Sequence, residues 1–204
     1  MHEEYILYHS TPLHNYPKIR RAGLTTGHRR LFWQSEPVYL YFTTFPKDAL
    51  YWSVSNIIER MQRNPLEKRW RWAQFSGSEN NEWGIDFDDT SKRGRKEMDD
   101  IYEELVHPVL LDSLNELVKD GIVILEVDIP SDLLRHGFEK NEYKLPVDIS
   151  GSGVDPERIS VYDAIERNDF YDIVYDICKT YKNLRRSKLT PPKSFYTDRP
   201  WELV

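Results

Sequence analysis

The chain has 204 residues and a net charge of −6, with 39% hydrophobic and 30% charged residues, a balance typical of one soluble globular domain. The acidic charge argues against a protein that coats nucleic acid, and a single cysteine, Cys178, excludes an internal disulfide. The sequence contains no secretory signal and no apolar run of the roughly 18 residues that cross a bilayer. We therefore expect a single cytoplasmic domain over residues 1–204, without a membrane partner.

The first strand is predicted at YILYHS, residues 5–10, and a short helix follows it. Thr11 and Pro12 are suited to the N-cap and the first turn of that helix, and Gly23 to its end.

A second strand is predicted at residues 36–44, which are rich in aromatic and β-branched residues. Alternation places Tyr39 and Tyr41 on one face, with Val38, Leu40 and Phe42 on the other. The next segment, FPKDALYWSVSNIIERM, reads as a helix.

The middle of the chain, residues 57–120, is predicted to be a helical insertion that could shape acceptor binding. SKRGRKE, residues 91–97, reads as a mobile solvated loop, because blocks of like charge favour such surfaces. Residues 99–121 have a helical spacing of apolar residues, with Pro108 as a kink and Gly121 as the end.

Two further strands follow, at residues 121–130 and 141–150. In NEYKLPVDIS, apolar residues recur at every second position, and Pro146 predicts that this strand lies at a sheet edge or carries a bulge. Glu142 stands where the strand begins.

The last part of the chain contains a Gly-Ser turn, a short strand, and an amphipathic helix over residues 169–184 that buries Cys178 as a small hydrophobe. The tail at 187–204 is broken by prolines and is predicted to be irregular.

Common catalytic motifs are absent. The sequence contains no phosphate-binding glycine loop, no Cys-x-x-Cys or His-x-x-x-His pair and no Gly-x-Ser-x-Gly elbow. The six histidines are scattered without ligand spacing, so no metal site is expected. What remains is one polar residue on each of three strands: His9, Tyr39 or Tyr41, and Glu142.

Three segments in this order resemble the diphtheria-toxin-like ADP-ribosyltransferases, in the branch of the poly-ADP-ribose polymerases. YHSTPLHNYPKIRRAGL resembles the family's opening, a strand that ends in His followed by a helix that closes on Gly-Leu. VYLYFTTFPKDALYW resembles its Tyr-bearing strand and the helix after it, and VILEVDIP, NEYKLPVDIS and DPERI resemble its later strands. The resemblance leaves out residues 57–120 and the tail.

The resemblance implies a domain of the α+β class, with a split, mostly antiparallel sheet and flanking helices. Such a domain binds NAD in a central cleft without a metal. The resemblance further implies Glu142, His9 and Tyr41 as catalytic residues, and it leaves open whether Tyr39 or Tyr41 stacks on nicotinamide. The implied NAD-binding residues are His9, Ser10, Thr11, Tyr39, Tyr41 and Tyr51. Ser10 departs from the family pattern, which often has Gly after the His.

The chemistry of NAD cleavage fits these residue types. Cleavage of the nicotinamide glycosidic bond builds positive charge on the ribose, which a fixed carboxylate such as Glu142 stabilises through the 2′-hydroxyl. A Tyr face is a favourable partner for the cationic pyridinium. His9 is expected to donate to a ribose hydroxyl, and the backbone of Ser10 to pair with the carboxamide.

Each of these residues also has an ordinary structural interpretation when taken singly. His9 reads as a histidine satisfied at a strand end, the tyrosines as core residues, and Glu142 as a solvated acid. Glu126 and Asp128 share the exposed face of their strand and read as solvated.

A second set of residues could bind the acceptor. KRWRWAQ interleaves cations and indoles as a single-stranded nucleic-acid surface does, and an amphipathic helix turn explains it equally well. The candidate acceptor-binding residues are Arg29, Arg30, Arg69, Trp70, Arg71 and Trp72.

The expected function is transfer of ADP-ribose from NAD to RNA, DNA or protein with release of nicotinamide. By analogy, such an enzyme could be a toxin or an antiphage effector with a neutralising antitoxin partner. The alternatives are an enzyme similar to RNA 2′-phosphotransferase, and a catalytically silent module that binds a nucleotide or a partner.

Overall fold

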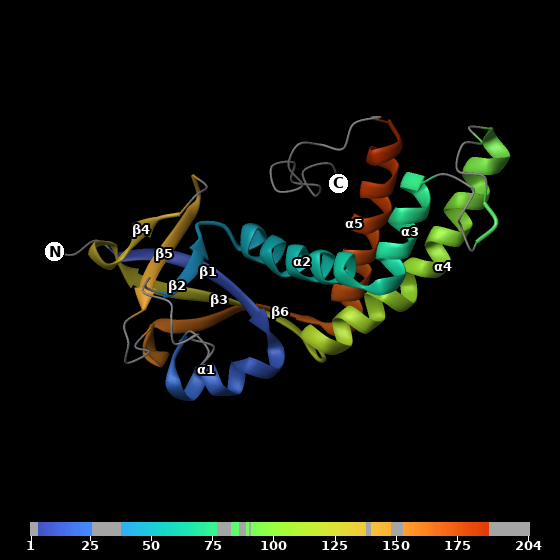
Figure 1. Ribbon diagram of the computed structural model, residues 1–204. Helices are drawn as coiled ribbons and strands as arrows, with labels where there is room; N and C mark the ends of the chain where they lie inside the picture. The colour runs from blue at the N-terminus through green and yellow to red at the C-terminus, as the bar shows by residue number, and fades with distance from the viewer. Residues whose placement is uncertain are drawn as a thin grey trace. The chain divides into compact units, whose positions relative to one another are not determined.

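The computed structural model describes residues 4–25, 38–76, 83–85, 89, 91–137, 140–147 and 153–187, with the side chains of all but residues 38, 71–76 and 179–187. The chain divides into two compact units (Figure 1). The sheet unit comprises Met1–Ser55 and Val118–Arg167, and the helical unit comprises Asn56–Leu117 and Asn168–Val204. The first segment of the helical unit nearly coincides with the predicted insertion at 57–120.

The described residues of the sheet unit form six strands in the order β4-β5-β2-β1-β3-β6, and every pairing between these strands is antiparallel. The strands are β1 (Glu4–Pro12), β2 (Val38–Thr43), β3 (Gly121–Pro130), β4 (Arg135–His136), β5 (Glu142–Val147) and β6 (Ile159–Glu166). Helices together with one antiparallel sheet confirm the predicted α+β class.

The edge position predicted for the 141–150 strand holds only beyond β4, because β5 is second from the edge and carries the two residues of β4 on its outer side. The proline is nevertheless accommodated. The two residues of β4 pair only with Tyr143 and Lys144, so Pro146 lies beyond the end of β4.

One face of the sheet forms the core with α1 (Tyr16–Ala22). The alternation predicted for β2 is confirmed, because Leu40 and Phe42 are buried while Tyr41 is 43% exposed. The core of this face consists of Leu7, Ile19, Leu24, Leu40, Phe42, Val123, Leu125, Val127, Ile129, Leu145, Val147 and Val154.

The predicted start of the first helix is wrong. Thr11 and Pro12 remain in β1, where they pair with β3, and a 3-10 turn (Leu13–Asn15) precedes α1. The predicted end is confirmed: Gly23 has a φ of 78° and its N–H donates to the carbonyl of Ile19. A Cβ at Gly23 would lie 2.1 Å from the carbonyl oxygen of Val154, so only glycine fits there.

The helical unit is built from the end of α2 (Pro46–Arg63), from α3 (Pro65–Ser76) and α4 (Lys92–Leu117), and from α5 (Arg167–Ser187). The prediction of a mobile loop at SKRGRKE is wrong, because α4 begins at Lys92. The hydroxyl of Ser91 accepts the N–H of Gly94 at 3.1 Å, which caps the helix and fixes its start. Pro108 lies inside α4, which continues on both sides of it.

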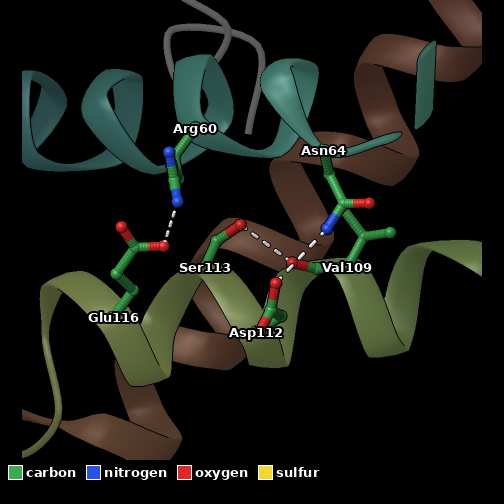
Figure 2. A network of polar contacts seen from close by, with 6 residues as sticks. All are labelled: Arg60, Asn64, Val109, Asp112, Ser113 and Glu116. Atoms are coloured by element: carbon green, nitrogen blue, oxygen red, sulfur yellow. Dashed lines mark hydrogen bonds and ion pairs between the residues drawn. The ribbon is translucent and has the colours of Figure 1, made fainter. Parts of the chain in front are cut away.

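Polar contacts join the end of α2 to α4 (Figure 2). Arg60 forms an ion pair with Glu116, and the amide of Asn64 donates to Asp112 at 3.3 Å. On α5, Phe170, Val174, Ile177 and Cys178 are buried, as the apolar spacing predicts. Burial raises the pKa of the Cys178 thiol to about 12, so this cysteine is an inert core residue.

Candidate functional site

Glu142 belongs to a row of residues that crosses three strands. Thr43 of β2 is the registered partner of Glu142 on β5 and of Tyr8 on β1. Registered partners in an antiparallel sheet point to the same face. The core residues Leu7 and Phe42 alternate with members of this row, so Glu142 lies on the face opposite the α1 core.

The side chain of Glu142 is enclosed, at only 4% exposure, so its interpretation as a solvated acid is wrong. Gly137 lies directly against it: a Cβ at Gly137 would be 2.5 Å from Oε2 of Glu142. The N–H of Gly137 also donates to the carbonyl of Glu142 at 2.8 Å. A side chain larger than hydrogen at position 137 would therefore collide with the side chain of Glu142.

Tyr39 and Tyr41 lie on the same face as Glu142. Tyr41 is the registered partner of Lys144, and Tyr39 is the partner of Pro146. The two tyrosine rings lie 6.4 Å apart, and the ammonium of Lys144 lies 4.8 Å from the centroid of the Tyr39 ring. Tyr41 therefore presents the more open of the two rings.

Ser10 faces the same side and links β1 to α2. Its hydroxyl donates to the carbonyl of Ala49 at 2.5 Å and accepts the hydroxyl of Ser53 at 2.7 Å. Ala49 and Ser53 are four residues apart and so share one side of the helix. These bonds place the start of α2 over the face that carries Tyr41 and Glu142.

His9 lies at the junction of β1 and β2, which pair at Tyr8 with Thr43 but at no later residue of β1. Nδ1 of His9 is 2.9 Å from the carbonyl oxygen of Tyr41. Since a carbonyl only accepts, Nδ1 carries the proton and Nε2 of the neutral ring is an acceptor. The donation from His9 to a ribose hydroxyl expected from the sequence is thus reversed: the hydroxyl would donate to Nε2.

Alternation assigns His9 to the opposite face from Glu142, and its ring is 5.7 Å from that of Phe42 in the core. The structure therefore unites Ser10, Tyr39, Tyr41 and Glu142 on one face. His9 lies at the strand junction beside them.

Burial lowers the pKa of His9 from its usual 6.5, and the bond to Tyr41 opposes this with a smaller effect. As the pH falls below 6.5, the unfolded state therefore binds more protons than the native state. The stabilisation that the neutral His9 side chain gives the fold is complete above pH 6.5 and is lost as the pH falls toward the folded pKa. Below pH 6.5 the free energy of unfolding of the wild type should fall as the pH falls. We expect His9→Asn to make this slope less steep, by at most about 1.4 kcal/mol per pH unit. Urea unfolding from pH 5 to 7.5 measures this. An equal flattening by His14→Asn, at an exposed position, would contradict it.

Two predicted NAD-binding residues lie away from this set. Thr11 is buried on the α1 side, and its hydroxyl accepts the amide of Asn15 at 3.4 Å. Tyr51 is buried on α2 two residues from both Ala49 and Ser53, so it projects from another side of the helix than the one that meets Ser10.

The candidate acceptor-binding residues differ in burial, and the structure describes the side chains of only two of them. Trp70 is 2% exposed and packs against Trp83 at 5.3 Å and Tyr102 at 6.0 Å, which leaves no ring face for a stacking base. Arg69 is exposed on α3. The side chains of Arg71 and Trp72, and all of Arg29 and Arg30, lie outside the described part of the chain.

The acids of β3 differ from each other. Asp128 is exposed, as its solvated interpretation predicts, whereas Glu126 is half-buried and accepts the hydroxyl of Tyr8 at 3.3 Å. Neither pairs with the other as an acid and base.

Sequence reasoning missed Ser53, Gly137 and Lys144 at this site. Two of these residues carried a local signal in the sequence. Lys144 follows Glu142 by two residues on a strand, so the two share a face, and Ser53 follows Ala49 by four residues on a helix, so these two share a side. Gly137 carried none, because its contact with Glu142 depends on how β4 pairs with β5.

Comparisons with protein-family models, with curated proteins and with solved structures find no significant match to this chain. Among the described residues, no group of three or more His, Cys, Asp or Glu is placed to hold a metal ion. In the same part of the chain, no helix is long and apolar enough to span a membrane.

Proposed function

We propose that this protein is an NAD-dependent ADP-ribosyltransferase that moves ADP-ribose to a macromolecular acceptor and releases nicotinamide. The observation that carries the proposal is the enclosed carboxylate of Glu142, on the sheet face that also carries Ser10 and the open ring of Tyr41. A sheet in which β1 and β2 pair only at Tyr8 with Thr43 also supports the split sheet that the resemblance implies.

Glu142 acts on the ribose. Its carboxylate accepts the 2′-hydroxyl and stabilises the positive charge that develops as the bond between C1′ and the nicotinamide nitrogen breaks. The electron pair of that bond goes to the ring nitrogen, which becomes neutral. A nucleophilic atom of the acceptor then bonds to C1′ and loses its proton to the medium.

Tyr41 and Ser10 hold the leaving group. The face of Tyr41 stacks on the pyridinium, and its greater exposure favours it over Tyr39, whose ring faces Lys144. The backbone of Ser10 pairs with the carboxamide, and the bonds of its side chain to Ala49 and Ser53 keep that backbone in place.

The acceptor is a nucleic acid or a protein. The burial of Trp70 removes one of the two indoles of the KRWRWAQ pattern that favoured nucleic acid in the sequence. A role as a toxin or an antiphage effector, with an antitoxin that neutralises it, follows by analogy with enzymes of this type.

The test is incubation of the purified protein with labelled NAD and a cell extract that is afterwards separated into protein and nucleic-acid fractions. We expect label in one fraction and an equal release of nicotinamide, both absent with Glu142→Ala. Asp128→Asn, at an exposed acid of β3, is the control and should label normally. No label and no nicotinamide would contradict the proposal and favour the silent nucleotide-binding module.

A further inference from the structure

Two tyrosine rings and a carboxylate lie together on the sheet face that carries Glu142. The hydroxyl of Tyr8 on β1 donates to Oε2 of Glu126 on β3 at 3.3 Å. The ring of Tyr162 on β6 meets the ring of Tyr8 edge to face, with 5.1 Å between the ring centroids. We call Tyr8, Glu126 and Tyr162 the tyrosine-glutamate patch, and all three belong to the sheet unit.

The patch is open to solvent. Tyr162 is 52% exposed, and Ile6, two residues before Tyr8 on the same face of β1, is 57% exposed. Tyr8 and Glu126 are half-buried. Aromatic and aliphatic side chains that gather on an exposed face mark a surface that binds a partner.

An irregularity in β6 places the ring of Tyr162. Val161 pairs with Leu125, and Asp163 is the next residue of β6 to pair with β3. Tyr162 is therefore the extra residue at this shift of register. Such irregularities re-aim a side chain and occur often beside functional sites, and here the ring is directed to Tyr8.

The patch suits a cation. Oε2 of Glu126 accepts the Tyr8 hydroxyl, and the second carboxylate oxygen can accept a further donor. Burial, and then the charge of Glu126, raise the pKa of the Tyr8 phenol from its usual 10.0, so the phenol keeps its proton. Within the described part of the chain Glu126 forms no ion pair, and Arg158, just before β6, pairs with Glu4 at 3.3 Å. A carboxylate beside aromatic rings attracts an ammonium or a guanidinium.

The patch continues the row of the proposed catalytic residue. Glu142, Thr43, Tyr8 and Glu126 are registered partners in turn across β5, β2, β1 and β3. Neighbouring strands lie about 4.8 Å apart, so the backbones of Glu142 and Glu126 are about 14 Å apart. An extended peptide covers that distance with about four residues.

We propose that the tyrosine-glutamate patch docks a lysine or arginine side chain of a protein acceptor. The inference rests on the proposed function, because it names the class of acceptor for the reaction at Glu142. The residue that receives ADP-ribose lies about four positions from the docked cation. A nucleic acid is disfavoured, since its phosphates would face the carboxylate of Glu126.

The test is titration of the isotope-labelled protein with peptides, followed through the NMR signals of its backbone amides. The probe is a short peptide of glycine and serine with two central arginines, and the matched peptide carries glutamines in their place. We expect the arginine peptide alone to shift amides of β1, β3 and β6 around the patch. Glu126→Gln and Tyr162→Leu should each weaken its binding about two- to fivefold.

Two control variants define what the patch contributes. Tyr162→Phe keeps the aromatic ring and should bind the arginine peptide as the wild type does. Asp128→Asn removes an exposed acid of β3 outside the patch and should change the affinity less than about twofold. An equal loss with Asp128→Asn and Glu126→Gln would show a general attraction to acidic surface and would overturn the proposal. The amide spectra show whether each variant folds.

The acceptor class is measured separately, with labelled NAD and cell extract. We expect label in the protein fraction, and less of it with Tyr162→Leu. Label in the nucleic-acid fraction, or equal binding of the two peptides, would overturn the docking proposal and leave the proposed function intact. Binding of the arginine peptide at the patch without any cleavage of NAD would support the docking surface and contradict the transferase.

Discussion

Glu142→Gln is expected to lower the rate of nicotinamide release from NAD by about 10² to 10³-fold, the effect of removing a preorganised charge from a transition state. The amide keeps the size of the side chain but not the negative charge that stabilises the developing cation on the ribose. Since Glu142 is buried on a paired strand, the amide should fit the same space. We therefore expect the KM for NAD to change much less than kcat.

The control for this prediction removes the same charge at a distance from the site. Asp128→Asn makes the same chemical change on an exposed position of β3 and should leave kcat within about twofold, as surface substitutions away from a site do. Unfolding curves for both variants show whether they fold. A folded Glu142→Gln protein with wild-type kcat would exclude Glu142 as the catalytic carboxylate.

Trp70→Ala is expected to destabilise the helical unit by about 3 to 5 kcal/mol, the usual cost of deleting a large buried aromatic side chain. Trp70 is 2% exposed and contacts the rings of Trp83 and Tyr102, so its loss leaves a cavity that its neighbours fill only in part. Urea unfolding followed by far-UV circular dichroism measures the change.

Leu66→Ala on the same helix is the matched control. Leu66 is 39% exposed, so its truncation should cost less than about 1 kcal/mol. The alternative, that Trp70 stacks on a nucleic-acid acceptor, makes the opposite prediction for Trp70→Ala. Stability would then stay near that of the wild type while labelling of nucleic acid fell.

Local patterns were sufficient for the strands that carry the candidate site. The alternation in β2 separates Tyr41 from Leu40 and Phe42, and burial follows that pattern. The same period in β5 sets Glu142 apart from Leu145, which is in the core. These assignments need only the chain's own periodicity, because alternate residues of a strand point to opposite faces.

The surroundings of these residues could not be predicted in the same way, because they depend on contacts between distant segments. The tautomer of His9 is set by the carbonyl of Tyr41 on another strand. Gly137 approaches the side chain of Glu142 closely, and the two-residue strand β4 that precedes Gly137 has no sequence signal of its own.

The acceptor-binding prediction shows a different limit. In KRWRWAQ, Trp70 and Trp72 are two residues apart, so a helix cannot direct both to the same side. The pattern alone does not say whether Trp70 is one of the buried residues, and α3 buries it. The choice depends on packing against Trp83 and Tyr102, which are distant in sequence.

The most direct test of the central claim is the amount of nicotinamide that the purified wild-type protein releases from NAD in the presence of cell extract. The account predicts release matched mole for mole by ADP-ribose bound to a macromolecule, and formation of both products about 10² to 10³-fold more slowly with Glu142→Gln. NAD that stays intact, or is consumed equally by Glu142→Gln, would contradict it.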